Sequence, residues 1–581
     1  MNAAPRIRRR EAAVGTQWPD DMPPLLRRIY AARGAHDIDA ACPRLSGLLP
    51  PDGLSNIDVA TRLLADAIER DARILVVGDF DCDGATACAV AVRGLRMLGA
   101  RDVVHAVPHR IAHGYGLSPA LVASLAPLQP ALLVTVDHGI ACHAGVAAAK
   151  ALGWQVLVTD HHLPGPRLPP ADAIVNPNLP DDAFPSKALA GVGVMFYVLL
   201  ALRARLRAAG RFDGAAPDLG TLLDLVAVGT VADLVPLDAN NRALVAAGLR
   251  RLRAGQGCAG LRALAEVSGR EAARLTAGDI GFAIGPRLNA AGRLEDMAIG
   301  IECLVCDDPR QAGELARMLH EINAERRAVQ QSMLDDAQTA LGRLPSVEPV
   351  AVGVCLHDPD WHPGVVGLVA SKMKDALHRP VVAFAPAAPD SPQLRGSARS
   401  IPGLHIRDVL AAVDSRHPGL IERFGGHAMA AGLTLARTDL AAFEAAFRAQ
   451  VEAMLDPALL RAEIVTDGAL AAHEFDFVHA AQLRDAGPWG QAFPEPVFDG
   501  EFAVVDWRIV GTRHLKLTLR MDGDPRPLSA IHFGGWRDVA PAAREHLVYR
   551  LAPDDYRGGD AVQLVVEYRE ARPAAGADGK V

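Results

Sequence analysis

Three short apolar runs in the first third of the chain each end in acidic residues. The first run, ILVVG at 74–78, is followed by DFDCDG, which places Asp79, Asp81 and Asp83 at every second position. Carboxylates two positions apart on an extended segment project from the same face, where they repel one another unless a cation lies between them. An aspartate can also cap a helix, but capping uses one side-chain oxygen and not three charged groups. The stretch therefore predicts a metal site.

Two further apolar runs end in the same way. ALLVTVDHGI brings Asp137 to the end of its run, and WQVLVTDHHLPG brings Asp160, His161 and His162 to the end of another. Alanine-rich, helix-like segments lie between the runs, so the order strand, helix, strand, helix, strand predicts a parallel sheet. In such sheets, ligands bind at the carboxyl ends of the strands. The acidic clusters are therefore expected to converge at one edge of the sheet.

A fourth acidic position follows in LLDLVAVGTVADLVPLDANNR. Asp233 interrupts an apolar stretch that is otherwise expected to be buried. A buried unpaired carboxylate is costly, so Asp233 needs a cation or a hydrogen-bond donor. Asp224 and Asp238 lie nearer the segment ends and are expected to be solvated or to cap helices. The mixture of carboxylates and imidazoles favours Mn²⁺ or Mg²⁺ over structural zinc.

The motifs resemble a known family when they are taken in order. DFDCDG, VTVDHG, TDHH and GTVADLVPL resemble the four motifs of the DHH phosphoesterases. GPRLNAAGR, HPGVVGLVASK, GSARS and RFGGHAMAAG resemble later segments of the bacterial single-strand-specific exonucleases of that family. The resemblance runs from about residue 50 to the C-terminal region. It implies hydrolysis of single-stranded DNA from the 5′ end, and partnership with single-strand-binding protein and a RecQ-type helicase in recombination and mismatch repair.

The resemblance also implies roles for the residues at the expected sheet edge. It assigns one ion, Mn²⁺ or Mg²⁺, to Asp83, Asp137, His161 and Asp233. It assigns a second ion to Asp81 and a bridging Asp137. His162 would touch the scissile phosphate, while Asp79 and Asp160 would orient the other groups. Two such ions can activate a water and neutralise the phosphodiester without a covalent protein intermediate.

Residues outside the metal site are expected to hold the DNA strand. By resemblance, those near the catalytic centre are Arg110, Tyr115, Arg287 and Asn289. Tyr115 could stack on a base or anchor a loop, and both interpretations stay open. In GSARS, Ser397 and Arg399 combine a hydroxyl and a guanidinium suited to a terminal phosphate, and His427 offers a further contact in RFGGHAMAAG. Taken singly, each of these motifs could be a glycine-rich turn with a surface arginine.

The length of the chain predicts several domains. At 581 residues it exceeds what one hydrophobic core normally serves. Short alternating segments near the C-terminus, FAVVDWRIV, RHLKLTLRM, LSAIHFG and AVQLVVEYRE, predict a small β-barrel, which the resemblance implies is an OB fold. The expected fold class is α/β, with a parallel-sheet catalytic domain, a long helical connector, an α/β DHH-associated domain and the barrel. The predicted limits are an N-terminal extension at 1–45, the catalytic domain at 46–260, the connector at 261–345, the DHH-associated domain at 346–455, the barrel at 456–570 and a disordered tail at 571–581.

Charge, cysteine content and hydropathy restrict the setting of the protein. The formal net charge of −8 argues against coating nucleic acid through bulk charge, but it leaves room for a local basic groove. Eight scattered cysteines suit a reducing compartment. The longest apolar run, 188–202, is shorter than the roughly 20 residues that span a bilayer, and the N-terminus lacks an apolar signal segment. We expect a cytoplasmic monomer that binds single-stranded DNA and no membrane.

Two other functions fit parts of the pattern. One is a DHH phosphodiesterase acting on oligoribonucleotides or cyclic dinucleotides, which the total length and the added barrel disfavour. The other is a catalytically inactive DNA-binding subunit, which the complete set of metal-binding positions disfavours.

Overall fold

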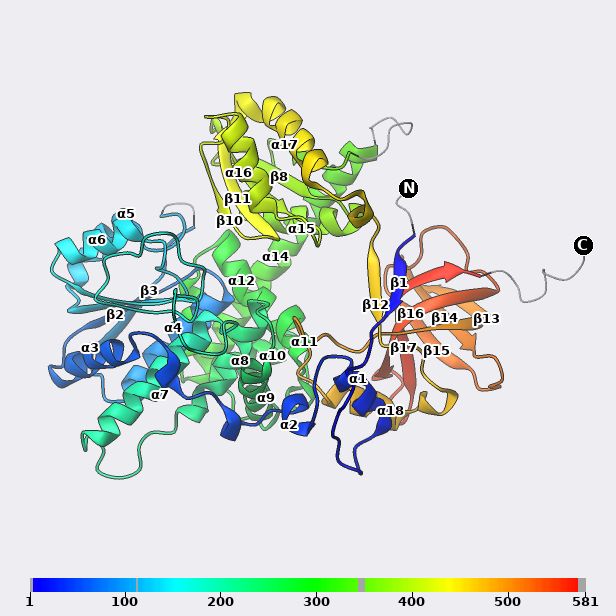
Figure 1. Cartoon of the computed structure of the whole chain (residues 1–581), viewed down its shortest axis with the longest axis horizontal. Coiled ribbons are helices and arrows are strands. Elements are labelled where there is room, and N and C mark those ends of the chain that lie inside the picture. The colour runs from blue at the N-terminus through cyan, green and yellow to red at the C-terminus, as the bar shows by residue number, and fades with distance from the viewer. Residues whose placement is uncertain (1–3, 111–112, 343–350, 573–581) are drawn as a thin grey trace, which may run out of the picture. The chain divides into compact units, whose positions relative to one another are not determined.

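The computed structural model describes residues 4–110, 113–342 and 351–572 (Figure 1). The chain divides into two compact units. The larger unit contains residues 9–292, 296–320 and those from 465 onward, and the smaller contains those up to 8, 293–295 and 321–464. A two-stranded sheet pairs β1 (Arg6–Arg9) with β12 (Glu463–Thr466).

A five-stranded parallel sheet forms the first part of the larger unit. Its strand order is β3-β2-β4-β5-β6. The strands are β2 (Ile74–Gly78), β3 (Val103–Ala106), β4 (Leu132–Val136), β5 (Gln155–Thr159) and β6 (Ala173–Val175). The three apolar runs form β2, β4 and β5, which are neighbours, so their carboxyl ends lie together. The parallel-sheet prediction is confirmed.

Both faces of this sheet are covered, which explains why its strands read as continuous apolar runs. Ile74 and Val76 of β2 join one core cluster, while Leu75 and Val77 join another. The first cluster includes side chains of α3 (Ile57–Glu69), α4 (Cys82–Met97), α7 (Gly191–Ala208) and α8 (Leu223–Ala232). The second includes those of α5 (Pro119–Leu125) and α6 (His143–Ala151).

Further helices complete the first part of the larger unit. They are α1 (Pro24–Ala31), α2 (Ile38–Ala41), α9 (Ala239–Arg253), α10 (Ala259–Val267), α11 (Ala277–Asp279), α12 (Gly285–Leu294) and α13 (Ala298–Val305). One π-helical turn, Ile280–Ile284, leads into α12. The predicted long connector helix is α14 (Pro309–Gly342), which continues into the smaller unit.

A closed five-stranded barrel forms the C-terminal part of the larger unit, as the alternating pattern predicted. Its order is β13-β14-β15-β17-β16, and the strands are β13 (Phe498–Val510), β14 (His514–Arg520), β15 (Leu528–His532), β16 (Arg544–Pro553) and β17 (Val562–Ala571). Helix α18 (Phe477–Asp485) packs on β16. Leu25 and Ile29 of α1 are buried in the barrel core, so the N-terminal segment belongs to the packing of this domain.

The smaller unit is an α/β domain around a second sheet. The order of this sheet is β10-β11-β9-β8-β7, in which only the β7–β8 pair is parallel. The strands are β7 (Val354–His357), β8 (Val381–Pro386), β9 (Gln393–Arg399), β10 (Arg423–Gly426) and β11 (Ala430–Ala436). The helices are α15 (Val366–Leu377), α16 (Ile406–Arg416) and α17 (Leu440–Met454). GSARS falls on β9, and RFGGHAMAAG forms the β10–β11 hairpin.

Some sequence-based expectations fall outside the described part of the chain. The predicted start of the DHH-associated domain at 346 lies outside it, and so does all but the beginning of the predicted tail at 571–581. The domain limits therefore stay a prediction. Over residues 4–110, 113–342 and 351–572, no helix combines the length and the apolar character needed to cross a membrane.

Candidate metal centre

The three aspartates after β2 are held in different ways. Asp81 is the N-cap of α4 and accepts a hydrogen bond of 3.0 Å from the amide of Gly84. Asp83 is 1 % exposed and accepts hydrogen bonds from the two backbone amides at the start of α7, from Gly191 at 2.6 Å and Val192 at 2.9 Å. Asp81 therefore caps a helix, whereas Asp83 is buried against the start of α7.

Two glycines allow the carboxylates to pack this closely. A Cβ at Gly84 would lie 2.5 Å from the backbone nitrogen of Asp79. A Cβ at Gly191 would lie 2.4 Å from Oδ1 of Asp137. Either substitution would force the acidic loop or the start of α7 to move.

Asp137, His161 and Asp233 meet at the carboxyl edge of the sheet. Nε2 of His161 lies 3.1 Å from Oδ1 of Asp137 and 3.5 Å from Oδ2 of Asp233. Asp137 follows β4 with a φ of 65°, a backbone conformation that is uncommon outside glycine. Its Oδ1 is buried and accepts no hydrogen bond from the part of the chain that the structure describes. A buried oxygen of this kind, beside an imidazole nitrogen, fits a cation.

The ligand atoms form three overlapping groups, within each of which they lie no more than 4.8 Å apart. The groups are Asp83 with His161 and Asp233, Asp79 with Asp81 and Asp137, and Asp137 with His161 and His162. The structure thus brings all five predicted metal ligands together, and it adds Asp79 to their neighbourhood. Oxygen-rich sets with an imidazole suit Mn²⁺ or Mg²⁺.

The crowding of carboxylates perturbs their protonation. Burial, followed by repulsion from Asp81, raises the pKa of Asp79 to about 8 and that of Asp83 to about 7. Burial, followed by repulsion from Asp83, raises the pKa of Asp137 and of Asp233 well above its ordinary value. The folded centre therefore holds protons at neutral pH unless a cation replaces them.

Asp160 has a different environment although it is equally buried. Its Oδ2 accepts a hydrogen bond of 2.9 Å from the amide of Ile140. Its Oδ1 accepts hydrogen bonds from the amides of His161 and His162 and lies 2.7 Å from Nδ1 of His162. Burial alone would raise the pKa of Asp160, but the contact with His162 holds it below its usual range. Burial opposes the charge on His162, yet Asp160 raises the pKa of that imidazole to about 9. Asp160 therefore fixes the orientation of His162.

An aromatic side chain that the sequence interpretation missed lies between two of the predicted DNA-binding residues. The guanidinium of Arg110 lies 3.9 Å from the centre of the Phe80 ring. The ring of Tyr115 meets that of Phe80 edge-on at 5.9 Å and that of His162 at 6.3 Å. Tyr115 is 53 % exposed. The sequence gives one indication of this role, because Phe80 is a large apolar residue inside the acidic motif. Such a side chain is expected there only if it packs on a neighbour.

Arg287 and Asn289 of α12 lie close to the same loop. Asn289 accepts a hydrogen bond of 2.8 Å from the amide of Cys82, at the start of α4. Arg287 is 7 % exposed and donates to the carbonyl of Ala283 at 2.6 Å, and its guanidinium also contacts His320. Both side chains therefore make hydrogen bonds or contacts with other residues of the larger unit.

The remaining predicted residues belong to the smaller unit. Nη1 of Arg399 donates to Oγ of Ser397 at 2.9 Å and to the carbonyl of Ala398 at 2.8 Å. A Cβ at Gly367, in α15, would lie 3.0 Å from Nη2 of Arg399 and 3.1 Å from Oγ of Ser397. Burial lowers the pKa of the Arg399 guanidinium from its ordinary value. His427 lies in the β10–β11 turn, where its amide donates to the carbonyl of Ala430 at 2.8 Å.

Two expectations about the region of Asp233 are wrong. Asp224 is neither solvated nor the N-cap of α8: it is fully buried in the first turn of that helix, and its Oδ2 accepts a hydrogen bond of 2.7 Å from the amide of Cys258. Leu234, which belongs to the apolar stretch expected to be buried, is 70 % exposed because α8 ends at Ala232. Asp238 caps α9 through the amide of Asn241, as predicted.

Three family models match separate parts of the chain. Residues 73–230 match the DHH family, N-terminal domain. Residues 348–453 match the DHHA1 domain, and residues 466–568 match the RecJ OB domain.

Curated relatives match almost the whole chain. Single-stranded-DNA-specific exonuclease RecJ of Salmonella typhimurium is 49 % identical over 98 % of this chain and 99 % of its own length. The protein of the same name from Escherichia coli is 48 % identical over 97 % of this chain and 98 % of its own.

Solved structures show the same similarity. RecJ from Thermus thermophilus in complex with Mn²⁺ superposes with a TM-score of 0.79 at 31 % identity, covering 98 % of this chain and 80 % of that one. The same protein in complex with Mg²⁺ gives a TM-score of 0.75 at 30 % identity, covering 98 % and 79 %. An exonuclease RecJ bound to manganese gives 0.58 at 38 % identity, covering 71 % and 97 %.

Proposed function

Because the chain belongs to the RecJ family of single-stranded-DNA-specific exonucleases, we propose that it hydrolyses single-stranded DNA with divalent cations. The observation that carries the proposal is a pair of ligand groups that share His161, one with Asp83 and Asp233 and one with Asp137, whose ligand atoms suit Mn²⁺ or Mg²⁺. The direction of digestion is proposed to run from the 5′ end, releasing nucleotides.

The proposed ligands divide the centre into two positions. Asp83, Asp137, His161 and Asp233 would hold one cation, and Asp81 together with the bridging Asp137 would hold the second. The contacts of Asp83 with two backbone amides support this, since they leave its carboxylate fixed beside His161. When bound, a pair of divalent cations supplies charge that activates water and stabilises the leaving oxygen of a phosphodiester.

The side chains around the cations would orient the strand. Asp160 keeps His162 in one orientation through the contact at Nδ1, which supports a role for His162 at the scissile phosphate. Asp79 would orient Asp81 and the acidic loop. Arg110 would contact the strand from its place on the Phe80 ring, and the exposed ring of Tyr115 would stack on a base. Arg287 and Asn289 would contact the strand from α12, which the hydrogen bond between Asn289 and the amide of Cys82 keeps beside the loop that carries the aspartates.

The smaller unit is proposed to hold the 5′ end. Ser397 and Arg399 form a hydroxyl and guanidinium pair that suits a terminal phosphate, with His427 as a further contact. Holding the end would determine how far the strand advances, and therefore which phosphodiester is cut.

Arg399→Ala separates end recognition from chemistry. A lost charge-assisted hydrogen bond of roughly 1.5–3 kcal/mol should lower hydrolysis of 5′-phosphorylated strands about 10–150-fold. Strands with a 5′-hydroxyl should lose far less activity, and Arg407→Ala, at an exposed arginine of α16, should leave both rates unchanged. An equal loss on both substrates, together with a lower melting temperature, would mean that Arg399 only braces its domain.

We propose that the barrel binds a part of the strand that is distant from the metal centre. Trp507 and Trp536 stack at 5.6 Å, and Phe533 is 63 % exposed beside His514. Because α1 packs into the barrel core, a point variant is a cleaner test than removal of the whole domain. Trp507→Ala should weaken binding of long strands by about 5–150-fold, since stacking contributes roughly 1–3 kcal/mol per base. Hydrolysis of very short oligonucleotides should change little.

The cellular setting is also a proposal. We propose a cytoplasmic monomer that works with single-strand-binding protein and a RecQ-type helicase in recombination and mismatch repair. Eight free cysteines support a reducing compartment. We further propose the domain limits 1–45, 46–260, 261–345, 346–455, 456–570 and 571–581, as predicted from the sequence.

Digestion of end-labelled strands tests the function as a whole. With Mn²⁺ present, a 5′-labelled single strand should release labelled mononucleotide first, while a 3′-labelled strand should shorten progressively. Duplex DNA and single-stranded RNA serve as comparison substrates. Release from the 3′ end first, preferred hydrolysis of RNA, or no hydrolysis would each contradict the proposal.

A further inference from the structure

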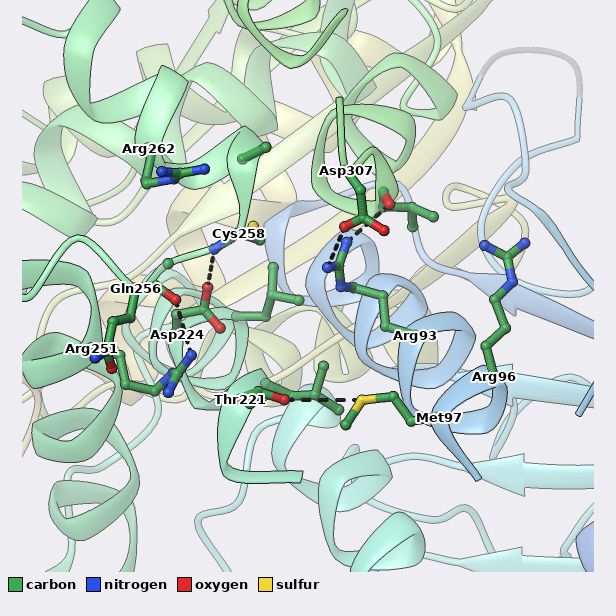
Figure 2. A pocket seen from close by; sticks show the side chains of 15 residues that line it. Arg93, Arg96, Met97, Thr221, Asp224, Arg251, Gln256, Cys258, Arg262 and Asp307 are labelled. Carbon is green, nitrogen blue, oxygen red and sulfur yellow. Dashed lines mark hydrogen bonds and ion pairs between the residues drawn. The ribbon is translucent and has the colours of Figure 1, made fainter. Parts of the chain in front are cut away.

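A polar pocket separate from the metal centre lies at the C-terminal end of α4 and the N-terminal end of α8 (Figure 2). Arg93 is ten positions after Asp83 on α4, which corresponds to about 15 Å along a helix. Asp224 is nine positions before Asp233 along α8, about 14 Å by the same rise. The end of α9, the start of α10 and the segment after α13 close the cavity, whose volume is about 400 Å³.

The lining of this pocket is unusually rich in arginine. Four arginines, Arg93, Arg96, Arg251 and Arg262, face it, against two aspartates, Asp224 and Asp307. Arg93 is fixed by Asp307 at 2.6 Å and by the carbonyl of Val305 at 2.9 Å. Arg96 and Arg262 are exposed, and Arg96 donates a hydrogen bond of 3.1 Å to the carbonyl of Val103. The excess of positive charge favours an anionic ligand.

Two buried polar atoms in the pocket have no hydrogen-bond partner among residues 4–110, 113–342 and 351–572. Asp224 is 0 % exposed, and while its Oδ2 accepts from Cys258, its Oδ1 accepts no hydrogen bond. Nε of Arg251 is likewise buried with no acceptor. An unmet acceptor and an unmet donor in one cavity each cost free energy that a ligand with complementary groups would recover.

The start of α10 belongs to the same wall, and the amide of its N-cap residue, Cys258, already donates to Oδ2 of Asp224. Cys258 is the N-cap of this nine-residue helix, and its side chain makes no capping hydrogen bond. The N-terminus of a helix favours phosphate groups because free amides and the helix dipole point toward them.

We propose that this arginine pocket, lined by Arg93, Arg96, Arg251, Arg262 and Asp224, binds a nucleoside phosphate. The phosphate would contact the arginines, and a hydroxyl or amino group of the sugar or base would donate to Oδ1 of Asp224. Free phosphate could contact the arginines but has no group that donates to Asp224, which repels it. A divalent cation would be repelled by the arginines. The volume lies within the range of small-ligand sites, about 300–1,000 Å³. The proposal does not depend on nuclease activity.

Equilibrium dialysis of the metal-free full-length protein, in the presence of a chelator, tests the proposal. The probes are radiolabelled deoxynucleoside 5′-monophosphates, deoxyguanosine without phosphate, and inorganic phosphate. At least one monophosphate should bind with a Kd below about 1 mM, and deoxyguanosine and phosphate should each bind about tenfold more weakly or worse. No binding, or equal affinity for inorganic phosphate, would overturn the proposal.

Variants at exposed positions locate the binding without disturbing the core. Arg262→Glu and Arg96→Glu should each weaken monophosphate binding about tenfold or more, because each replaces a charge-assisted hydrogen bond by repulsion. Arg44→Glu, at an exposed arginine of the same unit, is the matched control and should bind normally. Arg262→Glu and Arg96→Glu are also each made in an Arg399→Ala background, which removes the proposed 5′-phosphate contact, and there they should weaken binding by the same factor. Unchanged binding in both Arg262→Glu and Arg96→Glu would place the ligand elsewhere and refute the proposal.

Discussion

The metal centre and the barrel both bury aspartates, but they treat the negative charge in opposite ways. Asp499 on β13 is 2 % exposed, and Arg9, Thr466 and His546 surround it, at 2.9 Å, 2.6 Å and 3.2 Å. Burial alone would raise the pKa of Asp499, but these contacts hold it below its usual range. The charge is neutralised within the protein.

At the metal centre, the described residues compensate the negative charge much less completely. In the part of the chain that the structure describes, Asp83, Asp137 and Asp233 form ion pairs with His161 and with no arginine or lysine. Their pKa values are raised above the ordinary range, whereas that of Asp499 is lowered. A buried carboxylate without a cationic side chain beside it therefore points to a bound ligand. A buried carboxylate that is paired with arginine and histidine, as Asp499 is, points only to a role in stabilising the fold.

The largest effect is expected from Asp137→Asn. Because Asp137 is proposed to bridge both cations, hydrolysis should fall by more than the roughly 10–100-fold loss typical of residues that only orient ligands. The same variant should melt at a higher temperature than wild type without metal, since it removes a carboxyl group whose ionised form is disfavoured by burial and by the neighbouring aspartates.

The control for Asp137→Asn is Asp213→Asn, at an exposed position of the same domain, which should change neither property. Near-normal hydrolysis by folded Asp137→Asn protein would contradict the claim that the aspartates of the metal centre, unlike Asp499 of the barrel, bind cations.

Asp499→Asn should have the reverse consequences. The loss of charge-assisted hydrogen bonds from Arg9 and His546 should lower the free energy of unfolding by about 1–3 kcal/mol. Hydrolysis of short oligonucleotides by the folded protein should be retained. Denaturant unfolding measures the loss, with Asp506→Asn on the exposed side of the same strand as the control. A gain of stability in Asp499→Asn would show that its partners do not compensate the charge.

Sequence reasoning could find the metal centre because its information is local. Each acidic cluster directly follows an apolar run, so the strand and its ligands are read from one short segment, as with Val136 and Asp137. The alternation of strands and helices then fixes their common edge.

Long-range contacts explain what the sequence could not reveal. Asp224 is expected from the sequence to be solvated or to cap a helix, yet it is buried and accepts a hydrogen bond from the amide of Cys258, 34 positions later. The compensation of Asp499 depends on Arg9, 490 positions earlier. β16 was not among the predicted strand segments, although it pairs with both β13 and β17. No local pattern encodes such partners.

A smaller effect is expected in the pH dependence of stability without metal. The pKa of Asp79 rises from 3.8 to about 8 on folding and that of Asp83 to about 7, so the folded chain binds more protons than the unfolded chain between these values. Their stabilising contribution is complete below about pH 4 and is lost as the pH rises through 7 to 8. The contribution of Asp499 has the opposite sign and is lost only as the pH falls through its depressed pKa.

Denaturant unfolding in a chelator should therefore show stability increasing from about pH 8.5 to pH 6. Added Mn²⁺ should remove this increase, because cation binding is favoured by deprotonated ligands. Stability that decreases over the same interval without metal would contradict the assignment of uncompensated charge to the centre.

Direct titration with Mn²⁺ tests the central claim, that the uncompensated carboxylates at the carboxyl edge of the sheet form a cation site. Binding is followed by the loss of the free Mn²⁺ signal in electron paramagnetic resonance, for wild type, Asp137→Asn and Asp213→Asn. Wild type and Asp213→Asn should bind two ions per chain, and Asp137→Asn should lose at least one of them and hold the other more weakly. Equal binding by wild type and Asp137→Asn would contradict the account.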